Sequence, residues 1–153
     1  GTVQVDFFQP ERFDLHYISP QGKKERPVMI HRAIYGSLER FFAIMLEHLK
    51  GKRPFWLAPV QIKILTITDN QKEYAQQLYK KLSDENIRVA LDETSDPISG
   101  KIKSAQLQQI PWMLVIGDKE VANNTITLRH RSGKQEFSLS WEALVEKINN
   151  ENK

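Results

Sequence analysis

Hydrophobic and polar residues alternate over the first third of the chain and then change to helical spacing. The opening "GTVQVDFF" alternates as a strand does, and "PERFDLHYISPQGKKERPVMI" predicts a second strand, a turn at "SPQGKK" and a third strand. Three short strands joined in this way favour an antiparallel sheet. A helix is predicted over about 33–49 because apolar residues there recur at spacings of three and four, which indicates a buried stripe. The stripe comprises Ile34, Leu38, Phe42, Met45 and Leu49.

The rest of the chain alternates between strand and helix patterns. Strands are predicted at "VQIKILTIT", "IRVALD" and "PWMLVIG", separated by helices at "DNQKEYAQQLYKKLSDEN", with Asp69 or Asn70 as N-cap, and at "PISGKIKSAQLQQI". A hairpin around Ser132–Gly133 and a final helix capped by Ser140 follow. This order implies a parallel sheet covered by helices. The connector "GKRPFWLAP" marks the domain boundary, which gives domains of 1–54 and 55–153.

Composition excludes several classes of protein. A length of 153 residues suits one domain, or a domain with part of another, and 40% apolar with 27% charged residues is typical of a globular protein. The chain has no cysteine, so disulfide frameworks and cysteine-based metal sites are excluded. No apolar run approaches the ~18 residues that span a bilayer, and no secretory signal opens the chain. The absence of cysteine also fits a reducing compartment.

Charge is distributed unevenly along the chain. The net charge of +3 is too small to indicate nucleic acid by itself, but residues 98–135 hold six basic and only two acidic side chains. Such a local patch can bind phosphate where a neutral average would not. Lys101 and Lys103 stand near a predicted helix start, which also favours phosphate, although the glycine spacing of a P-loop is absent.

Two residues of the first third carry candidate chemistry. Arg40 shares a predicted helix face with the small residues Ala33, Gly36, Ser37 and Ala43, so a flat ring or a phosphate can approach it closely. The alternative is a tightly packed helix on which Arg40 pairs with an acid. His31 lies where strand gives way to helix and can ligate a metal, with the other ligands supplied from outside this chain. The alternative is a structural histidine.

Three residues near the predicted "PWMLVIG" strand can recognise nucleic acid. The loop "GDKEV" follows the carboxyl end of that strand, where ligands of parallel sheets tend to bind. Glu120 in this loop can accept hydrogen bonds from base amino groups. Arg129 and Arg131, in the hairpin that follows, can reach bases or phosphates. The alternative is a polar turn beside an exposed hairpin.

Several stretches together resemble a known family over essentially the whole chain. "PERFDL", "RPVMIHRAIYGSLERF", "WLAPVQ", "PWMLVIGDKEV" and "LRHRSGK" are similar to the carboxyl-terminal part of the threonyl-tRNA synthetases. Within it, "HRAIYGSLERF" resembles motif 3 of the class II synthetases, and the second half resembles the class IIa anticodon-binding domain. The resemblance implies an α/β fold with a mixed, mostly parallel sheet and helices on both faces. Antiparallel strands and one long helix from the end of a catalytic domain precede it.

The resemblance implies roles for individual residues. His31 matches one of three protein ligands of a zinc that holds the amino group and hydroxyl of threonine; the other two, a Cys and a His, lie upstream in the family. Arg40 matches the motif 3 arginine that contacts ATP, and Gln4 and Ser37 match residues of the aminoacylation pocket. In the second half, the expected tRNA-binding set is Glu120, Arg129, Lys103, Arg131, Lys101 and Ser95.

Members of that set differ in how closely they follow the family. Glu120 and Arg129 match residues that read anticodon bases. Lys103 stands where the bacterial family usually has arginine, and Ser95 where asparagine is usual. The segment "TSDPISGKIKS" also carries less positive charge than its counterpart in the family.

The resemblance further implies a parent enzyme that charges tRNA(Thr) with threonine, using ATP, Mg²⁺ and Zn²⁺, as a cytoplasmic homodimer with no membrane association. This chain alone is expected to be inactive and to bind no cofactor, since two zinc ligands and the motif 2 contacts are missing from it. An apolar patch along Ile34, Leu38 and Phe42 is then expected to be exposed. One alternative is a stand-alone, non-catalytic RNA-binding or regulatory module. Another is a class IIa synthetase for proline, glycine or histidine, against which His31 in "MIHRA" argues.

Overall fold

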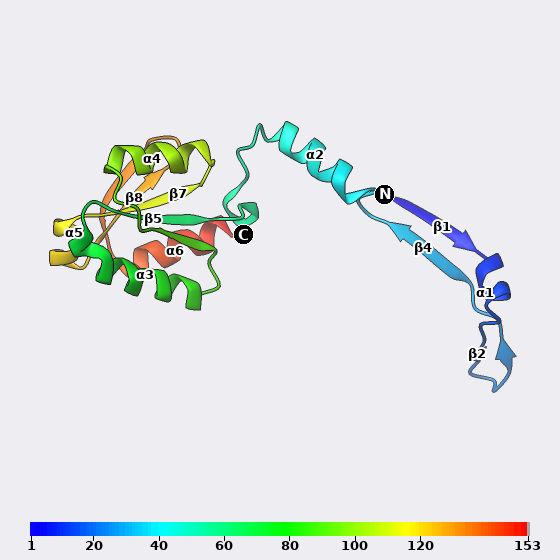
Figure 1. Ribbon diagram of the computed structural model, residues 1–153. Helices are drawn as coiled ribbons and strands as arrows, with labels where there is room; N and C mark the ends of the chain where they lie inside the picture. Colours follow the sequence, from blue (N-terminus) through cyan, green and yellow to red (C-terminus); the bar gives the residue numbers. More distant parts are fainter. Residues whose placement is uncertain (153) are drawn as a thin grey trace. The chain divides into compact units, whose positions relative to one another are not determined.

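The structure, a computed structural model, describes residues 1–152 and divides into two compact units, Gly1–His48 and the chain from Leu49 onward. Figure 1 shows both units. Within residues 1–152, no helix combines the length and apolar character needed to cross a membrane.

The first unit contains two antiparallel strand pairs and two helices. Its elements are β1 (Thr2–Asp6), α1 (Phe8–Arg12), β2 (Tyr17–Ile18), β3 (Lys24–Glu25), β4 (Met29–Ala33) and α2 (Leu38–His48). β1 pairs with β4, and β2 pairs with β3. The antiparallel direction is as expected, but the strands form two separate ladders instead of one three-stranded sheet.

The long helix begins later than its apolar spacing predicts. Residues 29–33 are paired with β1, and Gly36 has φ +69°, a value that interrupts a helix. Ser37 then acts as an N-cap, because its Oγ accepts a hydrogen bond from the backbone N–H of Arg40 at 3.3 Å. The expected face of small residues is therefore wrong: Ala33 and Gly36 precede the helix, and His31 lies within a strand.

The apolar stripe of this region is exposed in the chain. Ile34, Leu38 and Phe42 are 59%, 58% and 51% exposed, and none of the residues of α2 is buried. The expectation of a buried stripe is thus not met within this chain, whereas the expected exposed apolar patch is confirmed.

The second unit is a five-stranded mixed sheet in the order β6-β5-β7-β8-β9. β5 pairs in parallel with β6 and β7, while β8 is antiparallel to both β7 and β9. Its elements are η1 (Phe55–Leu57), β5 (Ile62–Thr66), η2 (Asp69–Gln71), α3 (Lys72–Asp84), β6 (Val89–Asp92), α4 (Ile98–Leu107), β7 (Trp112–Ile116), α5 (Asp118–Asn123), β8 (Ile126–His130), β9 (Gln135–Leu139) and α6 (Trp141–Glu151).

Helices cover both faces of this sheet (Figure 1). Successive strand residues point to opposite faces, so β5 contributes Ile64 to one core and Leu65 to the other. The larger core lies under α3 and α6, which supply Leu78 and Leu144 among others. The smaller core lies under α4, which supplies Ala105. The predicted α/β fold, a mixed sheet with helices on both faces, is confirmed.

Hydrogen bonds at the helix starts correct two details of the prediction. The segment expected to start at Asp69 or Asn70 is capped by Thr68, whose backbone N–H donates to Gln71 Oε1 at 2.7 Å in a capping box. The "GDKEV" segment, expected to be a loop, forms the helix α5. The predicted cap of α6 is confirmed, since Ala143 N donates to Ser140 Oγ at 3.2 Å.

A cluster of charges joins the β8–β9 hairpin to α6. Glu136 on β9 contacts Lys147 Nζ at 2.9 Å, His130 Nε2 at 3.0 Å and Lys134 Nζ at 3.4 Å. Hydrogen bonds from Lys147 and then His130 lower the pKa of Glu136 to about 2. Because the folded-state pKa lies below the unfolded value of 4.5, the stabilisation is present above that value and is lost as the pH falls toward 2.

The Glu136 cluster therefore predicts how acid unfolding responds to one substitution. Glu136→Gln will lower the thermal midpoint of unfolding at pH 7, and the difference from the unmodified chain will shrink as the pH is lowered from 4.5 toward 2. Thermal scans by circular dichroism at a series of pH values measure this. Glu73→Gln on α3 is the control. A difference that stays constant across this pH range would contradict the prediction.

Candidate functional site

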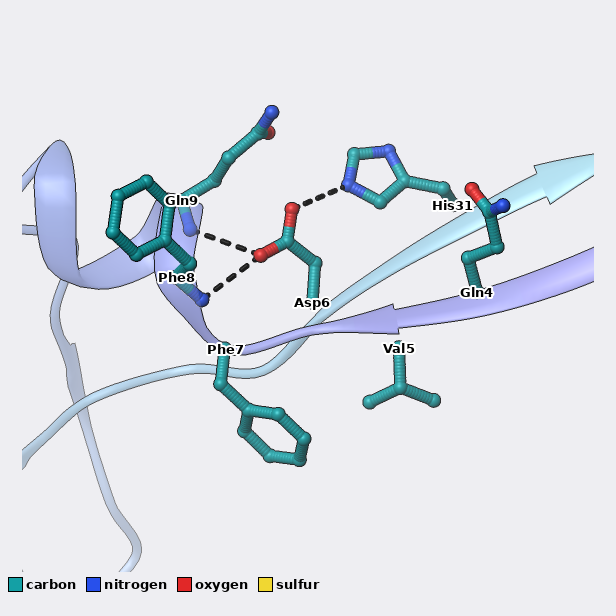
Figure 2. Close-up of a pocket in the computed structure, with 7 residues that line it drawn as sticks. All are labelled: Gln4, Val5, Asp6, Phe7, Phe8, Gln9 and His31. Carbon is teal, nitrogen blue, oxygen red and sulfur yellow. Dashed lines mark hydrogen bonds and ion pairs between the residues drawn. The ribbon is translucent and has the colours of Figure 1, made fainter.

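In the first unit, His31 is held by a carboxylate that is itself fixed by backbone amides. His31 Nε2 lies 2.9 Å from Asp6 Oδ2, and Asp6 Oδ1 accepts from Phe8 N at 2.9 Å and Gln9 N at 3.0 Å (Figure 2). The amide hydrogen bond from Gln9, followed by the one from His31, holds the pKa of Asp6 below its usual value. The imidazole is thus oriented by a carboxylate that stays ionised.

Gln4 lies beside this pair. It is directly opposite His31 in the β1–β4 ladder, and both residues line an open pocket with Asp6 (Figure 2). The expected association of Gln4 with His31 in one site is therefore geometrically possible on this strand pair. Within residues 1–152, no cluster of three or more His, Asp or Glu side chains is arranged to hold a metal ion.

Ser37 and Arg40 lie together at the start of α2. Ser37 Oγ donates to Glu39 Oε2 at 2.7 Å, accepts from Arg40 N, and lines a pocket with Arg40 and the aromatic rings of Tyr35 and Phe41. No acidic side chain among residues 1–152 lies within ion-pair distance of Arg40. Its guanidinium is available to a ligand that approaches from this aromatic side.

In the second unit, Glu120 is oriented by two hydrogen bonds. Its Oε2 accepts from Gly117 N at 2.9 Å, which closes the start of α5, and its Oε1 accepts from Thr127 Oγ1 at 2.8 Å. Each carboxylate oxygen still has a free lone pair, because such an oxygen accepts two hydrogen bonds. Glu120 thus presents a preorganised acceptor between α5 and β8.

Arg129 follows Thr127 on the same face of β8. Leu128, between them, belongs to the core under α3 and α6, so Thr127 and Arg129 point to the opposite face, where Met113 lies directly across from Arg129. Arg129 Nε is buried and has no hydrogen-bond partner among residues 1–152. A buried donor without a partner costs about 1–3 kcal/mol, so this guanidinium is suited to bind a ligand that accepts the missing hydrogen bond.

Ser95 and Lys103 are both exposed, as a contact surface requires. Ser95 lines a cavity of about 240 Å³ at the carboxyl ends of β5 and β6, together with Thr68 and Thr94. Lys103 extends from α4.

Lys101 lines the same pocket as Ser95, but its ammonium is engaged within the domain. Its side chain is only 3% exposed, and its Nζ donates to the backbone oxygen of Thr66 at 3.1 Å and lies 3.9 Å from Asp92 Oδ1. Asp92 also pairs with Lys63 at 3.0 Å. Burial acts to raise the pKa of Asp92, but hydrogen bonds from Thr94 and Lys63 outweigh it and hold that pKa below its usual value. Lys101 therefore anchors α4 to the end of β5 and to Asp92.

Arg131 is also committed elsewhere. Its Nη1 donates to the backbone oxygen of Arg53 at 2.8 Å, and its Nη2 to that of Lys52 at 3.4 Å. Burial, and then the neighbouring charge of Arg53, lower the pKa of Arg131. The basic stretch of 98–135 thus offers fewer free cations than its composition suggests.

The partners that orient these groups have almost no signature in the sequence. Asp6 is joined to His31 by the register of two strands 25 residues apart, a relation with no local signal. Thr127 follows Glu120 by seven residues, across the end of a helix. Only the Thr68–Gln71 cap had a readable signature, a threonine three residues before a glutamine.

Comparisons with known proteins match both units. The family model for the anticodon binding domain matches residues 57–151, and that for the tRNA synthetase class II core domain (G, H, P, S and T) matches residues 1–49. A threonine–tRNA ligase of Clostridium tetani is 48% identical over 99% of this chain and 24% of its own length. One of Caldanaerobacter subterraneus subsp. tengcongensis is 49% identical over 97% of this chain and 23% of its own length.

A solved structure agrees. The crystal structure of the RNA binding domain of threonyl-tRNA synthetase from Cryptosporidium parvum has a TM-score of 0.82 and 41% identity, and the match covers 97% of this chain and 38% of that one. The chain spans about a quarter of the length of the curated relatives, 24% and 23%. The resemblance noted from the sequence is confirmed. The chain belongs to the family of the tRNA synthetase anticodon-binding domain, here preceded by a segment of the class II core domain.

Proposed function

We propose that this chain is a carboxyl-terminal part of a threonine–tRNA ligase and that its second unit reads the anticodon of tRNA(Thr). One observation carries the proposal: in a domain of the anticodon-binding family, Glu120 is hydrogen-bonded to Thr127 of β8, and Arg129 lies two residues further along the same face of that strand. One presents oriented acceptors, and the other a buried donor that lacks a partner among residues 1–152.

These two groups supply complementary base recognition. A carboxylate accepts from the exocyclic amino groups of cytosine or adenine, and a guanidinium donates in pairs to the O6 and N7 of guanine. Unstacked anticodon bases expose those edges, as single-stranded RNA loops do. Lys103, exposed on α4, is proposed to contact the RNA backbone, and Ser95, exposed at the carboxyl ends of β5 and β6, an adjacent base.

The first unit is proposed to belong to the aminoacylation site of the parent enzyme. Arg40, beside the rings of Tyr35 and Phe41, would contact ATP, and Gln4 and Ser37 would line the pocket for threonine and its adenylate. The parent reaction activates threonine with ATP and Mg²⁺ and then transfers it to tRNA. The relatives' names support threonine over proline, glycine or histidine.

His31 fits one ligand of the proposed zinc site. An imidazole whose second ring nitrogen is held by a carboxylate is the common arrangement of zinc-binding histidines, and Asp6 supplies that carboxylate. The other two ligands would come from outside this chain. When bound, zinc would supply a Lewis acid that holds the amino group and hydroxyl of threonine.

We also propose that the domains divide at about residues 54 and 55, and that the parent acts in the cytoplasm as a homodimer. The chain alone is proposed to have no activity, since it holds one zinc ligand and no motif 2. ATP–pyrophosphate exchange by purified residues 1–153 would contradict this.

The proposal is tested by comparing which part of tRNA(Thr) the chain binds. A fluorescent anticodon stem-loop and an acceptor-stem minihelix of tRNA(Thr) should be titrated separately with the chain. The stem-loop is expected to bind at least about tenfold more tightly, because single-stranded bases are read while helical RNA offers mainly backbone. Equal affinities would overturn anticodon reading.

A further inference from the structure

Two arginines of the second unit donate hydrogen bonds to the backbone of the connector, residues 52–58, at the start of that unit. Arg131 donates to the carbonyl oxygens of Arg53 and Lys52, at 2.8 Å and 3.4 Å. Arg88 donates from Nη2 to the oxygen of Trp56 at 2.6 Å and from Nε to that of Ala58 at 2.9 Å. Four connector carbonyls, spread over seven residues, therefore accept from two side chains.

The two arginines reach the connector from different parts of the sheet. Arg88 immediately precedes β6, an edge strand, and its backbone is tied to the start of β5 because Gln61 N donates to Arg88 O at 2.7 Å. Arg131 follows β8, and its backbone N–H donates to Pro111 O at 2.9 Å, just before β7. Both anchors are thus fixed by the sheet itself.

An aromatic contact holds the connector between these anchors. Phe55 of η1 is buried, and its ring lies 4.5 Å from that of Trp112 on β7, centroid to centroid. The connector is therefore bonded at residues 52–53 and 56–58 and packed into the core between them.

These hydrogen bonds to backbone carbonyls favour arginine over lysine and disfavour an RNA-binding role for Arg131. A planar guanidinium offers two N–H groups side by side, which matches two neighbouring carbonyls, whereas an ammonium cannot bridge them in that way. Burial and the nearby charge of Arg53 lower the pKa of Arg131, because both disfavour the charged form of its guanidinium. A guanidinium that served an exposed phosphate would remain in water.

We propose that Arg131 and Arg88 are positioning residues that lock connector residues 52–58 onto the anticodon-binding domain. The lock fixes the direction in which the chain enters this domain. Arg131 stands two residues after Arg129 on the same stretch of chain, so the lock and the proposed base reader share one strand end but have separate tasks. The lock itself does not rest on the proposed function; only the RNA comparison below does.

Trypsin tests the lock in the whole chain, because Lys50 and Lys52 lie at its boundary while the Arg53–Pro54 bond resists cleavage. Mass spectrometry should time cleavage after Lys52 in the unmodified chain and in the variants Arg131→Gln, Arg131→Lys and Arg88→Gln. Release of the connector is expected to speed this cleavage at least about tenfold in Arg131→Gln, because proteolysis follows the population of the locally open state. Arg131→Lys should be almost as fast, because it keeps the charge but lacks the paired donors.

Arg129→Gln, two residues before Arg131 and on β8, is the matched control. It should leave cleavage after Lys52 within about twofold of the unmodified chain while weakening binding of the anticodon stem-loop, and Arg131→Gln should show the reverse. Unchanged cleavage in both Arg131 variants, or protection restored by lysine, would overturn the lock. Loss of stem-loop affinity in Arg131→Gln equal to that in Arg129→Gln would place Arg131 on the RNA instead. If no variant and no unmodified chain binds the stem-loop, the proposed function fails while the cleavage rates still decide the lock.

Global unfolding is separated from local release by a second site. Cleavage after Lys80 within α3 reports opening of the domain as a whole. The lock predicts faster cleavage after Lys52 with the rate after Lys80 unchanged. Equal acceleration at both sites in every Arg131 and Arg88 variant would assign these arginines to general stability and contradict the lock.

Discussion

Asp92→Ala is expected to destabilise the second unit by about 3–5 kcal/mol, since removal of one partner leaves an uncompensated buried charge. Asp92 is 7% exposed, and both Lys63 and the almost fully buried Lys101 rely on it for charge compensation. Without the carboxylate, two ammonium groups would remain close together in a region of low dielectric. Urea denaturation followed by circular dichroism measures the free energy of unfolding.

Substitution of Lys101 should lower the free energy of unfolding less than substitution of Asp92. Lys101→Met is expected to cost only about 1–2 kcal/mol, because Asp92 would keep Lys63 and the hydrogen bonds of Thr94, while the methionine would fill the same space beside α4. Asp96→Ala, an exposed aspartate of the following loop, is the control and should change little. A cost for Lys101→Met as large as that for Asp92→Ala would show that the ammonium, and not the carboxylate, is the indispensable partner.

Arg129→Ala is expected to weaken binding of the anticodon stem-loop by about 1–3 kcal/mol, roughly 5- to 150-fold, and to relax the preference at one anticodon position. The physical reason is the loss of a donor pair whose Nε has no protein partner among residues 1–152. Binding should be measured by fluorescence anisotropy at fixed salt. The stability of the domain should fall little, because no protein hydrogen bond of Nε is removed.

Glu120 requires a gentler substitution. Glu120→Ala would also remove the cap of α5 and the contact with Thr127, so a loss of RNA binding would be ambiguous. Glu120→Gln keeps an acceptor for Gly117 N, as glutamine does in capping boxes, and removes the charge. Glu120→Gln should alter the base preference with little change in the stability of the domain. Lys103→Ala should weaken binding of all RNA sequences alike and reduce the slope of log K against log salt concentration by about one.

Much of the second unit could be predicted from its pattern of residues. Alternation of strand and helix, with the apolar "PWMLVIG" strand at its centre, is a strong signal because each element is long enough to show its period. α5 was missed because six residues, Asp118–Asn123, are too few to show one. The start of α2 was missed because apolar spacing continued through Ile34, while pairing with β1 and the positive φ of Gly36 decided the backbone.

The candidate site was less predictable, since burial decides what a charged side chain does. Lys101 falls four residues before Ala105, on the stripe of α4 that faces the sheet, and that spacing was a signal that its ammonium would be buried. No comparable signal marks Arg131, because its partners are backbone carbonyls 78 and 79 residues away. Long-range contacts of this kind become visible only when the fold is known.

The most direct measurement is the affinity of this chain for full tRNA transcripts across a salt series. The panel compares a threonine anticodon with versions changed at its second and third bases. Anticodon reading predicts a loss of about 1–3 kcal/mol for either change at every salt concentration, reduced in Glu120→Gln or Arg129→Ala. Equal affinity for all transcripts, falling steeply with salt, would contradict it and leave only a generic basic surface.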